Sequence, residues 1–138
     1  MATHGKASDK DPLQSYLVLA RTEGEDGYLR VPDILELKLY ADLVILSACE
    51  TGRGHITGDG VNGLSRAFLL AGTSSLLMSL WSIPEKETLY QLYIFHESWR
   101  KEGLSKAQAL RQAQREELAN YLEEPDAWAG FAIIGEWL

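Results

Sequence analysis

The chain has 138 residues, a formal net charge of −7 and a pI near 4.9. Hydrophobic residues make up 46% and charged residues 24%, an ordinary globular balance, which excludes extended disorder and predicts one domain over residues 1–138. An acidic chain repels a phosphate backbone, which argues against direct binding to nucleic acid. Neither a membrane-length apolar run nor a signal peptide is found, so we expect a cytoplasmic protein.

The first third of the chain predicts a β-hairpin followed by a helix. A short apolar run over residues 17–20 precedes the turn sequence Gly-Glu-Asp-Gly at residues 24–27, and residues 28–31 suit a return strand. Pro32 then fits the first position of a helix that buries Ile34, Leu35 and Leu37.

The middle of the chain predicts two buried strands with a helix between them. Residues 43–46, Leu-Val-Ile-Leu, form a continuous apolar run of the kind found in central parallel strands covered on both faces, and residues 76–81 form a second. A glycine-rich loop over residues 52–60 follows the first run. Apolar residues at helical spacing then predict a helix: Val61, Leu64, Phe68 and Ala71. Gly72 is its expected C-terminal cap.

The last third predicts two helices and a closing strand. Ser82-x-x-Glu85 and Ser105-x-x-Gln108 are capping-box signatures that open the helices. The first helix has an apolar stripe of Leu89, Leu92, Phe95 and Trp99, and the second a stripe of Ala107, Leu110, Ala113 and Leu118. Residues 131–134 suit the final strand. The acidic pairs Glu116-Glu117 and Glu123-Glu124 are expected on solvated helix surface.

Strands that alternate with helices predict an α/β layer structure with a mainly parallel sheet. The single cysteine, Cys49, excludes an internal disulfide, and the cysteine and the three histidines lack the paired spacing of a zinc site. We therefore expect neither a metal nor an organic cofactor.

The segment LVILSACETGRG, followed by GDGVNGLSRAFLLAGTSSLLMSLWSIPEKET, resembles the second half of CHAT domains, caspase-like domains that are often fused to TPR repeats in bacteria. SKAQALRQAQ and WAGFAIIG look like the closing helix and last strand of that family, and ATHG looks like its histidine motif. The resemblance implies a caspase-hemoglobinase-like three-layer fold with a mainly parallel sheet. The strands that precede the histidine are expected to be missing, which would make residues 1–138 a single partial CHAT domain whose exposed sheet edge favours a homodimer.

In the family a histidine follows one strand and a cysteine ends the neighbouring strand, and the matching positions are His4 and Cys49. A cysteine thiol has an ordinary pKa of about 8.5, so an imidazole is needed to take its proton and later to protonate the leaving amine. The resemblance also implies an oxyanion hole from the N–H groups of Gly5 and Cys49. The chain is therefore expected to be a cysteine endopeptidase domain that cleaves peptide or protein substrates, regulated by a TPR or other sensor domain.

Glu85 has two interpretations. As part of Ser82-x-x-Glu85 it would accept backbone hydrogen bonds at a helix start. The resemblance instead implies an acid beside the primary specificity pocket, lined also by Ser79 and Trp81, where a carboxylate favours a substrate arginine or lysine. Trp81 also suits a core position.

Three alternatives stay open at this point. The domain can be a catalytically inactive interaction module or an inert fragment of a larger TPR–CHAT protein. Gly58-x-Gly60-x-x-Gly63 matches a dinucleotide-binding pattern, but that pattern must follow its strand directly, and here a loop with Cys49 intervenes. His55 and His96 are less suitable catalytic bases than His4.

Overall fold

The computed structural model describes residues 5–6, 11–47 and 58–138; His4 and Cys49 lie outside these ranges. The elements in chain order are β1 (Gly5–Lys6), a 3₁₀ turn (Pro12–Gln14), β2 (Tyr16–Val18), β3 (Tyr28–Arg30), α1 (Val31–Glu36), β4 (Val44–Leu46), α2 (Gly58–Leu70), β5 (Ser75–Ser79), α3 (Glu85–His96), a π-helical turn (Glu97–Lys101), α4 (Lys106–Asn120), α5 (Pro125–Trp128) and β6 (Phe131–Gly135). Within the described ranges, no helix is long and apolar enough to cross a bilayer.

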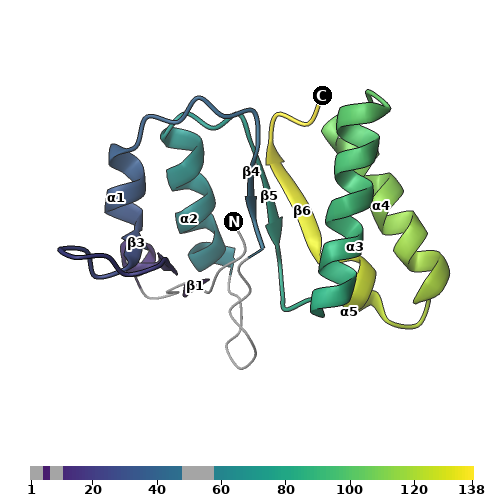
Figure 1. The fold of residues 1–138 in the computed structure, drawn as a ribbon, viewed down its shortest axis with the longest axis horizontal. Coiled ribbons are helices and arrows are strands. Elements are labelled where there is room, and N and C mark those ends of the chain that lie inside the picture. Colours follow the sequence, from purple (N-terminus) through teal and green to yellow (C-terminus); the bar gives the residue numbers. More distant parts are fainter. Residues whose placement is uncertain (1–4, 7–10, 48–57) are drawn as a thin grey trace.

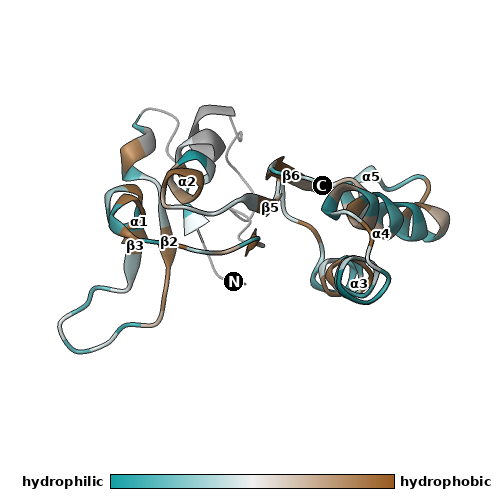
Figure 2. Cartoon of the chain, turned by 90° about the horizontal axis from the view of Figure 1, so that it is seen from above, coloured by the Kyte–Doolittle hydropathy of each residue, from teal (hydrophilic) through white to brown (hydrophobic). Residues whose placement is uncertain are grey.

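Strands β4, β5 and β6 form a sheet in that order, with α1 and α2 on one side of it and α3 and α4 on the other (Figures 1 and 2). Every residue of the middle strand β5 is buried, which explains its continuous apolar sequence. The predicted α/β class is confirmed.

The predicted mainly parallel sheet is not confirmed by the described strands. β4 pairs with β5 in parallel, whereas β5 pairs with β6 antiparallel. The reason is the number of helices in each connection. α2 alone returns the chain to the edge where β4 began, so β5 runs in the same direction as β4. The two antiparallel helices α3 and α4 instead return the chain to the edge of the sheet where β5 ended. β6 therefore starts at that edge and runs in the opposite direction to β5 (Figure 1).

The second sheet holds the predicted hairpin. β2 pairs antiparallel with β1 and with β3, and Gly5 lies opposite Leu17. Gly27 ends the turn with a φ of +78°, a conformation that glycine adopts without strain. α1 begins at Val31, one residue before the predicted start, and the Asp33 carboxylate accepts a hydrogen bond from the Arg30 N–H at 2.8 Å.

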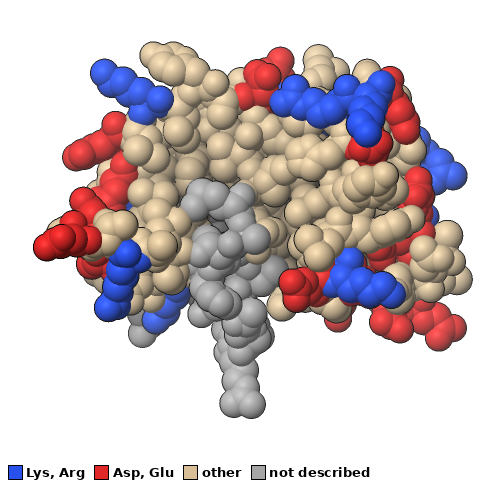
Figure 3. Space-filling view, viewed as in Figure 1, with Lys and Arg blue, Asp and Glu red and all other residues tan. Residues whose placement is uncertain are grey.

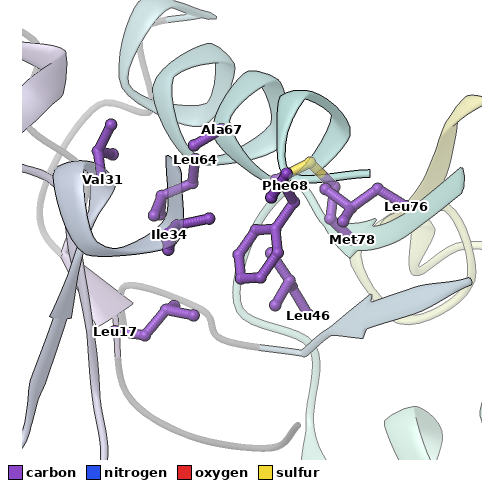
Figure 4. Close-up of a cluster of buried hydrophobic side chains, with 10 residues drawn as sticks. Leu17, Val31, Ile34, Leu46, Leu64, Ala67, Phe68, Leu76 and Met78 are labelled. Carbon is purple, nitrogen blue, oxygen red and sulfur yellow. The ribbon is translucent and has the colours of Figure 1, made fainter. Parts of the chain in front are cut away.

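Two hydrophobic clusters cover the two faces of the main sheet because alternate residues of β5 point to opposite sides. Leu76 and Met78 lie in the first cluster with Phe68 of α2, and Leu77 lies in the second with Phe95 of α3. Figure 4 shows the first cluster, in which side chains from α1, α2 and both sheets meet. Each face of the sheet thus has its own core.

The predicted cap at Gly72 is confirmed. Gly72 has a φ of +105°, its N–H donates to the Leu69 carbonyl at 3.1 Å, and the Thr73 N–H donates to the Phe68 carbonyl at 3.2 Å. These two bonds form a Schellman motif, which satisfies carbonyls at the end of α2. A side chain at position 72 would collide with the backbone carbonyl of Leu39.

One predicted capping box is confirmed and the other is wrong. At α4 the Gln108 N–H donates to Ser105 Oγ at 3.3 Å, and the Ser105 N–H donates to Gln108 Oε1 at 3.0 Å. At α3 the N-cap is Pro84 and Glu85 is the first helical residue. Ile83 precedes a proline, which disfavours the helical region for it, so a helix cannot begin at Ser82.

Candidate active site

The described part of the predicted site lies where β4 and β5 end. Leu46 is the last residue of β4 and Ser79 the last of β5, and Glu85 begins the helix that follows. The residue predicted to supply an oxyanion-hole N–H, Gly5, begins β1. In Figure 1, β1 and the carboxyl ends of β4 and β5 lie toward the same, lower end of the molecule. The predicted pair His4 and Cys49 lies outside the described residues, so its geometry stays a prediction.

Ser79 ties the ends of the two parallel strands together. Its side chain is buried, and its Oγ donates to the Leu46 carbonyl at 3.5 Å. This carbonyl belongs to the last residue of β4, so Ser79 stabilises the point from which the chain leaves the sheet toward residue 49. Ser79 thus stabilises the end of β4 from within the core. Its lining of a substrate pocket remains a prediction.

Trp81 is held at the same edge of the sheet by a hydrogen bond and by hydrophobic packing. Its indole Nε1 donates to the Asp126 carbonyl at 3.0 Å, and the half-buried ring packs against the second hydrophobic cluster. Gly130 leaves room for it, since a Cβ there would lie 2.5 Å from Ile83 Cδ1 and 3.0 Å from Trp81 Nε1. Trp81 therefore packs at the border of the second core and is partly exposed, and its lining of a substrate pocket remains a prediction.

Glu85 is exposed at the first position of α3. A carboxylate in the first turn is stabilised by the partial positive charge of the helix N-terminus. Because the capping box is not formed, the capping interpretation of Glu85 is wrong, and its carboxylate faces solvent at the edge where β5 ends.

Of the other two candidate bases, His55 lies outside the described residues. His96 and the competing glycine motif lie in places that do not suit their predicted roles. His96 is the last residue of α3, about 16 Å along the helix axis from Glu85 at 1.5 Å per residue, and its ring lies 6.3 Å from that of Trp99. α2 begins at Gly58, so Gly60 and Gly63 lie inside the helix. A dinucleotide-binding motif needs its first glycines in the turn between strand and helix, so this pattern does not form one.

Glu117 is the feature that the sequence analysis missed. The prediction that it lies on solvated surface is wrong: 2% of the residue is exposed. The signal was the spacing in α4, where the buried residues recur every three or four positions: Lys106, Ala109, Leu110, Ala113 and Glu117. Four residues beyond the buried Ala113, position 117 falls on the same face.

The comparisons with known proteins agree with this architecture. Residues 1–136 match the family model described as the CHAT domain. The chain therefore belongs to the CHAT domain family. It is similar to tetratricopeptide repeat protein 28 from Homo sapiens, with 34% identity over 129 residues, and to the same protein from Mus musculus, with 33% identity over 129 residues. Each match covers 93% of this chain, and the chain spans about 5% of the length of these relatives. Both relatives are mammalian, so the bacterial setting that the resemblance implies is not confirmed by them.

Proposed function

We propose that this chain is a cysteine endopeptidase domain of the CHAT type, with Cys49 as the nucleophile and His4 as its partner. The observation that carries the proposal is the parallel pairing of β4 and β5, in which Leu46 lies opposite Met78. In α/β sheets, ligands bind beyond the carboxyl ends of parallel strands, and Cys49 follows the end of β4 by three residues.

The chemistry proposed for this site is acyl transfer to sulfur. The His4 imidazole takes the proton from Cys49 Sγ, and the sulfur attacks the scissile carbonyl carbon. The N–H groups of Gly5 and Cys49 stabilise the resulting oxyanion. The imidazolium then protonates the leaving nitrogen as the C–N bond breaks, which leaves a thioester. A water molecule, deprotonated by His4, attacks the thioester and releases the carboxylic acid and the free thiol.

Substrate selection is proposed to depend on Glu85 and Trp81. The exposed Glu85 carboxylate can pair with a substrate arginine or lysine, and the exposed part of the Trp81 ring can contact the aliphatic part of that side chain. Ser79 keeps the strand ends in register from within the core.

The experiment compares two acyloxymethyl-ketone peptide probes, one with arginine and one with alanine at the residue before the reactive group. Both are tested on this chain and on a version extended upstream. Labelling is expected at Cys49 and is lost in Cys49→Ala and reduced on the order of 10²-fold in His4→Ala. Labelling that persists in Cys49→Ala contradicts the mechanism.

The pocket assignment has its own test. Glu85→Gln is expected to lower the rate of labelling by the arginine probe about tenfold and to leave the alanine probe unchanged. Glu123→Gln, at an exposed acidic residue distant in sequence, removes the same charge and serves as the matched control. Equal losses with both probes would show that Glu85 supports the fold and does not select substrates.

The names of the mammalian relatives support a role next to tetratricopeptide repeats. We infer that the domain acts in the cytoplasm and is controlled by such repeats or by another sensor domain. The second candidate function is an interaction module without catalysis, which is favoured by a groove between α3 and α4 that needs no contribution from Cys49. Failure of both probes on both versions of the chain would favour this second function.

A further inference from the structure

A groove of about 730 Å³ lies between α3 and α4. Its lining comes from the first half of α3 and the last turns of α4 and includes Lys86, Glu87, Tyr90, Tyr93, Glu117 and Tyr121. In Figure 1 the first half of α3 and the last turns of α4 lie at the lower right of the molecule. Of these lining residues Glu117 alone is buried, and none of them belongs to either hydrophobic cluster.

Glu117 lies in this groove, and one of its two carboxylate oxygens lacks a hydrogen-bond partner among the described residues. The residue is 2% exposed, and within the described part of the chain its Oε2 has no hydrogen-bond partner. Burial raises the pKa of this carboxyl, and repulsion from the Glu87 carboxylate raises it further, while Lys86 lowers it. A buried carboxylate without a partner is costly, so an apolar residue at this position would serve the packing of α4 better. A group that donates to Glu117 from outside the chain would account for its presence.

Tyrosines surround the groove and are held in place by carboxylates. The Tyr90 hydroxyl donates to Glu116 Oε2 at 3.2 Å, and a side-chain hydrogen bond with Glu87 raises the pKa of Tyr121. Tyr93 is 60% exposed at the same groove. Aromatic rings beside carboxylates form a favourable environment for a cation, because both the ring faces and the carboxylates carry negative charge.

We propose that this groove binds an arginine side chain from a basic segment of a partner protein, with the guanidinium paired to Glu117 and stacked on the tyrosines. Arginine fits better than lysine because its planar guanidinium is weakly hydrated, stacks on rings and offers several donors. The net charge of −7 and the carboxylates of Glu87 and Glu117 in the groove favour a basic partner. At the lower right of Figure 3, acidic side chains lie on both sides of a basic group. The groove volume exceeds that of one guanidinium, which leaves room for the residues on either side of the arginine.

The test uses fluorescein-labelled pentapeptides of alanine with a central arginine, lysine or citrulline, and measures fluorescence polarisation with the full chain. Citrulline keeps the shape of arginine without the charge. The arginine peptide is expected to bind at least about tenfold more tightly than the citrulline peptide, with lysine between them. Equal binding of the arginine and citrulline peptides overturns the proposal, and so does equal competition by free spermine, which would indicate a site for small cations.

Two variants connect the binding to the groove. Glu117→Gln is expected to reduce the affinity for the arginine peptide about tenfold, to the level of citrulline, whereas Glu123→Gln changes the net charge equally and leaves the affinity within about twofold. Unchanged arginine binding in Glu117→Gln overturns the assignment. Tyr93→Ala removes an exposed ring without touching the core, and it is expected to weaken binding several-fold.

Sedimentation of the native chain and of Tyr93→Ala tests whether a second copy of this chain occupies the groove. A dimer that is lost in Tyr93→Ala would assign the groove to a second copy of this chain and overturn the proposal. A mass that is the same for both chains supports a separate partner. Cys49→Ala is expected to bind the arginine peptide normally, so this result stands apart from the peptidase proposal.

Discussion

The two faces of the main sheet are packed by different means. On the side of α1 and α2 the first cluster is entirely apolar, and a buried polar residue there, Ser65, is small. On the side of α3 and α4 three long polar or charged side chains are buried: Gln91, Lys106 and Glu117. The buried side chains described on the first face are thus mainly apolar, while the second face also contains long polar and charged side chains that need partners.

Two of the three long side chains find those partners in the C-terminal segment. Gln91 Nε2 donates to the Ala127 carbonyl at 2.6 Å, and Lys106 Nζ lies 3.5 Å from the Glu136 carbonyl. Both bonds tie the helical layer to the segment that carries α5 and β6. Glu117 has no such bond to the C-terminal segment. Among the described residues both Glu117 Oε2 and Gln91 Oε1 are buried without a hydrogen-bond partner, but of these two groups only the carboxylate can carry a charge, so it is at Glu117 that we place a function beyond packing.

The largest expected effect comes from removing one phenyl ring on each face. Phe68 is 3% exposed in the first cluster and Phe95 is 1% exposed in the second. Phe68→Ala and Phe95→Ala are each expected to lower the free energy of unfolding by about 3–5 kcal/mol, because each leaves a cavity in a closed core. Urea denaturation followed by circular dichroism measures the change. If Phe95→Ala alone cost less than about 1 kcal/mol, the second face would repack around the lost ring, and the expectation that both faces are closed cores would be contradicted.

The next effect compares the glycines that end the helices of the two layers. Gly72 after α2 and Gly103 after the π-helical turn both have positive φ, +105° and +72°. A Cβ at position 72 meets the Leu39 carbonyl, whereas a Cβ at position 103 has nothing within 4 Å. Gly72→Ala is expected to cost about 3 kcal/mol, and Gly103→Ala about 1 kcal/mol from backbone strain alone.

Thermal unfolding of both glycine variants distinguishes the collision from the strain. Similar losses of stability would show that the backbone around Leu39 moves away from the new methyl group. A larger loss at Gly72 would confirm that the first layer is the tighter of the two.

Local patterns predicted the parts of the fold that depend on neighbouring residues in the sequence. The spacing of Leu64, Phe68 and Ala71 gave the buried face of α2, and Ser105 gave the start of α4. The direction of β6 was not predictable in this way, because a buried strand has the same apolar pattern in either direction. That direction depends on two helices in the preceding connection, a property of the whole topology.

The candidate site was predictable to a similar extent. The resemblance supplied Ser79, Trp81 and Glu85, which lie at or after the end of β5, while their lining of a substrate pocket stays a prediction. The resemblance supplied His4 and Cys49, whose geometry stays a prediction. Glu117 was missed because its charge was given more weight than its position on the buried stripe of α4.

A smaller effect is expected at the cap that begins α4. Ser105→Ala removes the oxygen that accepts from the Gln108 N–H, and such a loss typically costs about 1 kcal/mol. Ser82→Ala is the control, since Ser82 is exposed and does not cap α3. Chemical denaturation is expected to show no change for the control. Equal losses at the two serines would mean that Ser82 makes a contribution other than capping.

The smallest effect, and the one most specific to the second face, is a pH dependence from Glu117. Burial raises the pKa of this carboxyl above its ordinary 4.5, so the folded chain holds the proton more tightly than the unfolded chain does. The stability that this proton contributes is fully present below about pH 4.5 and is lost as the pH rises through the folded pKa. Glu117→Gln cannot lose a proton, so its advantage over the native chain is expected to grow with pH and then to stay constant.

Urea denaturation between pH 4 and pH 8 measures this difference, with Glu123→Gln as the exposed control. Parallel curves for Glu117→Gln and the native chain would mean that the buried carboxyl titrates as it does in the unfolded state. The arginine peptide adds a sharper test, because a guanidinium paired with Glu117 favours the ionised carboxylate and lowers its pKa. Saturating peptide is therefore expected to reduce the advantage of Glu117→Gln at neutral pH. This result would support direct pairing between the Glu117 carboxylate and the arginine of the proposed partner.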